Sequence, residues 1–411
     1  MKTLVNNLGP SVAFQAPRPV LASRRVESID LLRGAIMIIM ALDHVRDFFH
    51  GDAFVYSPTD LGRTSVFLFF TRLITHYCAP VFVFLAGVAA HLYGARRTRK
   101  ELSVFLLTRG IWLVLLEFTV IALERSFNPH FTFITLQVIW AIGISMIVLS
   151  ALVWMDRRVI LFTGLLLIAG HNLLDKVHVP GTGMASFLWA LLHDHGFFTF
   201  GPVTFHVFYP LLPWIGIMAV GFCFGSLYLP GYDPARRRKM LFAIGSGAIL
   251  LFILLRSGNF YGDAAYWSVQ KNPIFSFLSF LNVTKYPPSL LYILMTLGPA
   301  LIFLALSERP LNAWTARIAI YGRVPMFYYL AHVFLIHFLA LIAAQLSGYR
   351  WTDMILNGMV NSSPDLKGYG FNLPTVYIIW IGLVLTLYPF CKWYDRYKRS
   401  HQATKWWLSY L

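Results

Sequence analysis

The chain has 411 residues, of which 57% are hydrophobic and 13% are charged. Soluble domains carry about a quarter charged residues, and a water-soluble fold could not hide so much apolar surface, so soluble globular classes are excluded. The 34 Lys and Arg residues outnumber the 18 Asp and Glu residues and give a net charge of +16. Because these basic residues sit in short loops between apolar runs, we expect them to set membrane orientation, and we expect no nucleic-acid partner.

Apolar runs of about 20 residues, long enough to cross a lipid bilayer, follow one another along the chain. We therefore predict an all-α fold, a polytopic membrane bundle of about ten transmembrane helices over 27–395, with cytoplasmic tails over 1–26 and 396–411. The fifth run is the shortest, so whether it crosses fully is left open. The predicted spans are 31–49, 67–93, 104–123, 132–154, 158–174, 207–228, 239–256, 288–306, 319–344 and 373–392.

The charges between these runs alternate along the chain. Loops 51–66, 175–206, 257–287 and 345–372 contain few Lys and Arg residues, whereas both tails and the loops between are basic. Positive residues favour the cytoplasmic side, so both termini should lie inside and the four longer loops outside. This pattern predicts an integral membrane protein whose longer loops face the periplasm or the cell exterior, with 187–192 as a short interfacial helix.

The end of the first predicted span carries the densest group of ionisable residues. Asp43 and Asp47 are four residues apart on one helical face, and Arg46 and His50 form a second such pair. The cluster is either a solvated helix end with internal salt bridges or a functional site. His44 is the member that a salt bridge explains least, because an imidazole suits a proton acceptor at neutral pH and a neighbouring carboxylate could orient it.

Further ionisable residues fall within later spans. Arg72 and His76 share a face of the second span, where Pro80 should loosen the helix, and an arginine there needs a carboxylate or an anionic ligand. Glu117 and His332 lie midway along the third and ninth spans, where each could be a packing partner or a functional group. His193 and His195 form only a weak metal-type pattern, so we expect no metal.

Three blocks resemble the transmembrane acyltransferase superfamily. Ser28–Gly34 leads into a helix that ends in Asp43-His44, Pro80–Gly87 is an aromatic run that ends in glycine, and Tyr321–His332 is a glycine-then-histidine span. Taken together with the middle part, Leu281–Ser289, they look most like bacterial proteins with a heparan-alpha-glucosaminide N-acetyltransferase catalytic domain, related to acyltransferase type 3. This resemblance implies a location in the bacterial cytoplasmic (inner) membrane. The enzyme that names the domain looks to have an asparagine where this chain has His44, and its active histidine further along.

The resemblance implies a membrane acyltransferase that moves an acyl group from cytoplasmic acyl-CoA to an extracytoplasmic acceptor. The expected acyl group is acetyl, and the expected donor is therefore acetyl-CoA. The acceptor would be a glycan or another small molecule with an amine or hydroxyl. The oligomeric state is left open, with a homodimer as one possibility. His44 would act as a general base or form an acyl-histidine, steered by Asp43 or Asp47, while Arg72 stabilises the oxyanion. The implied catalytic residues are Asp43, His44, Asp47, Arg72, His76 and His332, and Arg33 and Arg323 would bind the cofactor.

A proton-coupled transporter of a small solute is the alternative from another class. In that case Asp43, Glu117 and His332 would form a proton relay. Such transporters often show interrupted helices at matching positions in two halves, and the sequence does not show this symmetry.

Overall fold

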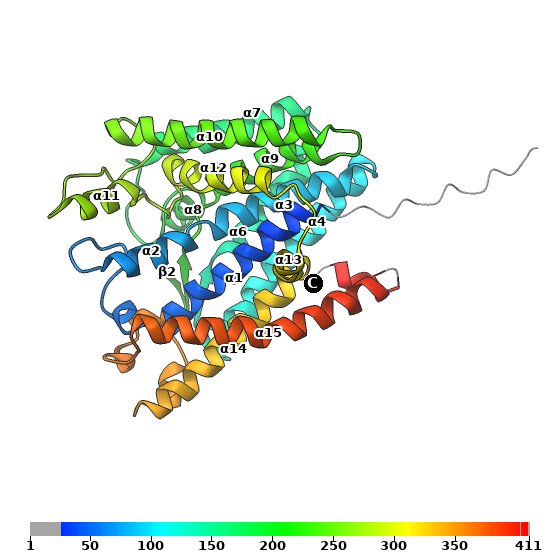
Figure 1. The fold of residues 1–411 in the computed structure, drawn as a ribbon. Coiled ribbons are helices and arrows are strands. Elements are labelled where there is room, and N and C mark those ends of the chain that lie inside the picture. Colours follow the sequence, from blue (N-terminus) through cyan, green and yellow to red (C-terminus); the bar gives the residue numbers. More distant parts are fainter. Residues whose placement is uncertain (1–25, 403, 410–411) are drawn as a thin grey trace, which may run out of the picture.

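Helices dominate the computed structural model, which describes residues 26–402 and 404–409 (Figure 1). The predicted N-terminal tail lies almost entirely outside these residues. The long helices are α1 (Glu27–Phe49), α3 (Cys78–Gly94), α4 (Arg99–Leu116), α6 (Val138–Leu152), α7 (Arg157–Gly170), α9 (Leu211–Phe224), α10 (Pro234–Gly258), α12 (Leu290–Leu306), α14 (Pro325–Leu346) and α15 (Leu373–His401). The short ones are α2 (Val66–Thr75), α5 (Ala122–Ser126), α8 (Met184–Leu192), α11 (Pro273–Leu281) and α13 (Ala313–Arg323).

Within the described part of the chain, seven helical segments are long and apolar enough to cross a membrane. They are Val66–Gly94, Arg99–Ser126, Arg157–Leu174, Leu211–Tyr228, Pro234–Gly258, Pro325–Leu346 and Leu373–His401, and α6 and α12 are shorter apolar helices. Large apolar side chains such as Phe162, Leu254 and Ile378 are exposed on their outer faces, as lipid contact requires. The protein is therefore an integral membrane protein, while the count of ten spans and the orientation stay predictions.

Two proline residues shape the helices next to the candidate site. Pro80 cannot donate to the carbonyl of His76, and that carbonyl instead accepts a hydrogen bond from the Tyr292 hydroxyl of α12 at 2.6 Å. The chain accordingly divides the predicted second span into α2 and α3. Pro325 excludes the helical conformation at Val324, which separates α13 from α14 and divides the predicted ninth span in the same way.

A small sheet departs from the predicted all-α fold. Strands β1 (Phe133–Leu136), β2 (Gly196–Phe200) and β3 (Val203–Val207) lie in the order β1-β3-β2, with β1 parallel and β2 antiparallel to β3. Aromatic and β-branched residues favour this conformation, and their inner face packs on α8. The predicted fourth span therefore begins with a strand, and its helix α6 begins only at Val138.

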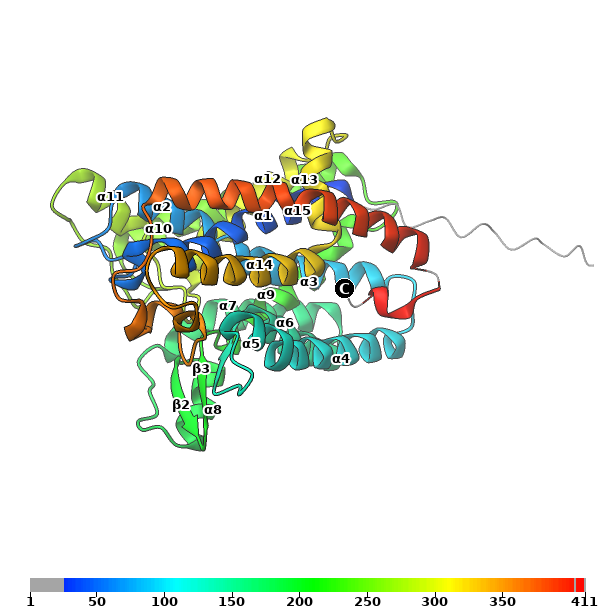
Figure 2. The same cartoon turned by 90° about the horizontal axis from the view of Figure 1, so that it is seen from below.

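The sheet marks one end of the bundle, which we call the sheet end, and the C-terminal end of α15 lies at the opposite end (Figure 2). Helix α1 runs through the middle of the molecule (Figure 1), where it contacts α2, α3, α12, α13, α14 and α15. It is buried along most of its length. Polar residues on α1 therefore face other helices rather than lipid.

Pairs of glycines bring neighbouring helices into backbone contact. At each crossing a Cβ on one glycine would overlap or crowd the backbone of the other helix, so only glycine permits the approach. The pairs are Gly34 with Gly322 (α1 and α13), Gly87 with Gly221 (α3 and α9), Gly110 with Gly143 (α4 and α6), Gly164 with Gly216 (α7 and α9) and Gly245 with Gly298 (α10 and α12).

We expect Gly245→Leu to lower the free energy of unfolding by about 1–3 kcal/mol, because overpacking forces neighbouring groups apart. A Cβ at Gly245 would lie 2.7 Å from the Gly298 carbonyl oxygen. Gly247→Leu in the same helix is the matched control, since nothing lies within 4 Å of its added Cβ. Thermal unfolding in detergent measures the melting temperature of each purified variant. Equal melting temperatures for the two variants would contradict the prediction.

Candidate functional site

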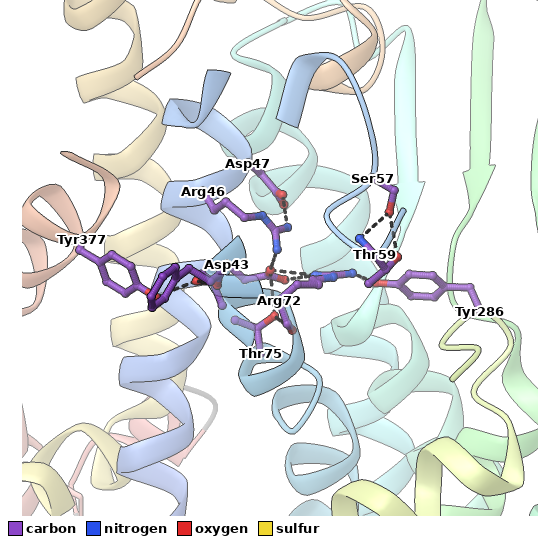
Figure 3. Close-up of polar contacts among 11 residues, drawn as sticks. Asp43, Arg46, Asp47, Ser57, Thr59, Arg72, Thr75, Tyr286 and Tyr377 are labelled. Carbon is purple, nitrogen blue, oxygen red and sulfur yellow. Dashed lines mark hydrogen bonds and ion pairs between the residues drawn. The ribbon is translucent and has the colours of Figure 1, made fainter. Parts of the chain in front are cut away.

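A buried carboxylate joins α1 to α2 near the sheet end (Figure 3). Asp43 accepts hydrogen bonds from Arg72 Nη1 at 2.8 and 2.6 Å, one to each carboxylate oxygen, and from the Thr75 hydroxyl at 2.9 Å. Arg46 Nη1 lies 3.0 Å from the same carboxylate. The side chains of Asp43 and Arg72 are only 15% and 13% exposed. Each buried charge is thus compensated by opposite charge, which a low-dielectric interior requires.

The ion-pair network extends beyond Asp43 on both sides (Figure 3). Arg46 Nη2 donates to Asp47 at 2.6 Å, and the Arg46 residue is only 3% exposed. Arg72 Nη2 lies 3.5 Å from the Tyr286 hydroxyl in the loop before α12. The cluster is therefore a packed network inside the bundle, rather than the solvated helix end that was one of the two interpretations of the sequence.

His44 contacts another histidine instead of a carboxylate. Its ring stacks on His332 of α14, with centroids 5.1 Å apart and an interplanar angle of 28°. Among the described residues no side chain hydrogen-bonds to His44, so the steering by Asp43 or Asp47 has no direct contact behind it here and stays a prediction. Those carboxylates are held by Arg72 and Arg46, whose positive charges they compensate.

His332 is fully buried and lies between two tyrosines. Its Nδ1 is 2.7 Å from the Tyr328 carbonyl oxygen, and its Nε2 is buried with no hydrogen-bond partner among the described residues. The Tyr329 ring meets His44 edge-on at 6.3 Å. Since Nδ1 can only donate to a carbonyl, the Nε2 of His332 is an acceptor when the ring is neutral.

A cavity of about 590 Å³ at the sheet end gathers most of the predicted catalytic residues. Asp43, His44, Asp47, Arg72 and His76 all line it. His76 is 3% exposed, and its ring packs edge-on against Tyr292 at 5.5 Å. We call this cavity the sheet-end cavity.

Many further polar residues line the sheet-end cavity, among them Tyr56, Glu117, Arg125 and Lys285. Burial, then the hydrogen bond that its hydroxyl donates to Asp52 at 2.7 Å, raises the pKa of Tyr56 to about 12, so it stays a neutral phenol. Sequence reasoning missed Tyr56, Arg125 and Lys285 as site residues. Lys285 lies in Leu281–Ser289, a stretch that carried part of the family resemblance but was given no role in the site. Arg125 lies just beyond an apolar run, and nothing in its local sequence marks it as a site residue.

A second cavity, of about 370 Å³, lies further along the same helices, away from the sheet end. Arg33 and Arg323, the residues predicted to bind the cofactor, both line it, together with Arg109 and Lys398. Arg33 Nη1 donates to the Gly322 carbonyl at 3.2 Å, and Arg323 lies 3.7 Å from Asp30 and 3.6 Å from Asp395. We call this basic space the arginine cavity.

The two cavities share a wall. Met40, Phe82 and Val138 line both of them. Met40 lies one helical turn before His44 on α1, so both side chains point to the same face. Tyr329, whose ring contacts His44, lines the arginine cavity. His44 therefore lies where molecules from the two cavities could meet.

Comparison with known protein families identifies the family of the chain. The catalytic-domain model of heparan-alpha-glucosaminide N-acetyltransferase matches residues 25–257, more than half of the chain. The chain therefore belongs to this family, which implies an acetyltransferase activity and confirms the resemblance to the heparan-alpha-glucosaminide N-acetyltransferase catalytic domain. The blocks after residue 257 lie outside the match, and the relation to acyltransferase type 3 stays a prediction. No curated protein matches the chain.

We expect Asp43→Ala to lower the free energy of unfolding by about 3–5 kcal/mol, because it leaves the buried Arg72 without its partner. Arg72→Ala should cost less, because Arg46 remains 3.0 Å from the Asp43 carboxylate. The double variant should lose less than the sum of the two losses. Chemical or thermal unfolding of the wild type, the two single variants and the double variant in detergent gives the coupling free energy between Asp43 and Arg72.

Arg63→Ala is the surface control for this cycle. Arg63 and Asp60 lie 3.9 Å apart with side chains 63% and 42% exposed, so its loss should change stability by less than about 1 kcal/mol. Strictly additive losses for Asp43 and Arg72 would show that their contact contributes nothing.

Proposed function

We propose that the protein is a membrane-embedded acyltransferase that moves an acetyl group from cytoplasmic acetyl-CoA to an amine or hydroxyl of an extracytoplasmic acceptor. The observation that carries the proposal is the shared wall of the two cavities, with His44 beside it. Two reactants held on opposite sides of one wall can react without either crossing the bilayer. Family membership supports acetyl transfer as the chemistry.

The arginine cavity is the proposed donor site. Its cationic side chains, Arg33, Arg109, Arg323 and Lys398, suit the phosphates of a nucleotide, which guanidinium groups bind through charge-assisted hydrogen bonds. The apolar residues between those cations and the shared wall, including Met37 and Leu113, suit the pantetheine arm and its thioester. This end of the bundle is the cytoplasmic side in the proposed orientation.

The sheet-end cavity is the proposed acceptor site. There His44 removes the proton from the acceptor amine or hydroxyl as its nitrogen or oxygen attacks the thioester carbon. The bond from that carbon to sulfur then breaks, CoA leaves as the thiolate, and the proton on His44 neutralises it. An acyl-histidine intermediate remains the alternative route.

Positive charge in the sheet-end cavity would stabilise the oxyanion that forms on the thioester. Arg72 is already paired with Asp43, so its charge is largely compensated. Arg125 lines the same cavity and is therefore the better candidate for the stabilising donor. His332 acts as a positioning residue in this scheme, because it holds the His44 ring by stacking.

We expect His44→Ala to lower acetyl transfer by about 10²–10⁴-fold, the usual contribution of a general base. The variant should elute as a folded protein, and transfer from radiolabelled acetyl-CoA by purified protein in vesicles measures the loss. His130→Ala is the control, because His130 is exposed and lines neither cavity. Unchanged transfer in His44→Ala would exclude the mechanism, and solute uptake without consumption of acetyl-CoA would support the transporter instead.

We expect Arg33→Gln to raise the KM for acetyl-CoA by about tenfold, because a hydrogen bond to a charged group contributes about 1.5–3 kcal/mol. The KM for S-acetylpantetheine, which has no nucleotide, should stay unchanged. Arg238→Gln is the control, since Arg238 is exposed and lines neither cavity. An equal rise for both donors would place the nucleotide elsewhere.

A further inference from the structure

A cluster of two histidines and one aspartate lies at the sheet end. His171 begins the 3-10 turn His171–Leu174 that ends α7, Asp175 follows that turn, and His193 caps the C-terminus of α8. One potential ligand atom from each of the three residues lies within 4.8 Å of the others. None of these three residues lines either cavity.

The two histidines are buried, and their ring nitrogens are not fully used. Each residue is only 3% exposed. Neither ring nitrogen of His171 has a hydrogen-bond partner among the described residues, although the backbone of Pro288 lies near the ring. The Nδ1 of His193 is also without a partner, while its Nε2 lies 3.2 Å from Asp175 Oδ1. Leaving buried polar atoms without partners is unfavourable unless a ligand satisfies them.

We propose that His171, Asp175 and His193 bind a divalent transition-metal ion, with Zn²⁺ as the expected occupant. Imidazole nitrogens and a carboxylate oxygen are ligands that Zn²⁺ takes at about 2.0–2.2 Å, with water in the fourth position of a three-residue site. Ligand atoms in such a tetrahedron lie about 3.3 Å apart, so separations that now reach 4.8 Å would shorten by up to about 1.5 Å.

The residue next to His171 supports this assignment. Asn172 Nδ2 donates to Asp175 Oδ2 at 2.9 Å, and Asn172 Oδ1 accepts from the Leu290 backbone N–H at 2.9 Å. The other carboxylate oxygen, Oδ1, is the atom that faces His193. Hydrogen bonds of this kind orient metal-binding carboxylates, so Asp175 is already fixed with one oxygen toward the two histidines.

A metal bound by these residues would link the segment that carries α8 to the end of α7. His195, two residues after His193, lines the sheet-end cavity, so this link would also hold one side of that cavity in place. The proposed site thus uses His193 of the weak His193–His195 pattern but not His195. His193 faces His171, with ring centroids 5.3 Å apart, whereas His195 lies toward the cavity. This inference revises the expectation that no metal binds.

The test is metal content and metal-dependent stability of the full-length protein in detergent. After EDTA treatment and reconstitution with Zn²⁺, elemental analysis should find about one Zn²⁺ per chain, as a single three-ligand site requires. Added Zn²⁺ should raise the melting temperature of the EDTA-treated protein. His171→Gln and His193→Gln should each abolish both effects.

His178→Gln is the matched control, because His178 lies in the same segment with a side chain that is 65% exposed. It should keep the full metal content and the full rise in melting temperature. Wild-type protein that neither retains Zn²⁺ nor gains stability from it would overturn the proposal, whether or not the variants fold. Equal Zn²⁺ content in wild type and His171→Gln would also overturn it.

Discussion

The pairing of Asp43 with two arginines is the constraint on which the site depends. A carboxylate inside a helical bundle is tolerated only with opposite charge close by, so Arg72 of α2 and Arg46 of α1 must converge on it. That convergence fixes the rotation of α1 and the approach of α2. His44 is the next residue, so it turns to the neighbouring face of α1 and meets His332 of α14 instead of the ion pairs. One charge requirement thus sets where the imidazole lies.

Close helix crossings hold this geometry in place. The backbone contact of Gly34 with the α13 helix anchors the first half of α1, and the contact of Gly87 with α9 anchors α3 behind the sheet-end cavity. Pro80 leaves the His76 carbonyl without its helical hydrogen bond, and the Tyr292 hydroxyl of α12 donates to that carbonyl instead. The site is therefore built on helices whose separations small residues fix, with loops supplying only its rim.

Sequence patterns predicted which segments are helical and which residues line the sheet-end cavity better than they predicted the contacts between those residues. Long apolar runs located nearly every long helix, because the length of a membrane span can be read from the local sequence. It missed the sheet, because β1 lies within an apolar run and pairs with β3, which follows about 70 residues later. The His44–His332 stack joins residues 288 positions apart, and Arg125 and Lys285 enter the cavity only through the packing of distant helices. No local pattern carries such information.

The wall formed by Met40, Phe82 and Val138 has a second consequence. Two cavities that approach each other inside a membrane protein would form most of an ion channel if both filled with water, and these three apolar side chains line both of them. If the proposed transfer takes place here, the same few side chains must let two reactants come within bonding distance and also insulate the membrane against ions. Their size is therefore constrained from both sides: large enough to stop ions, yet thin enough for an acetyl group to pass.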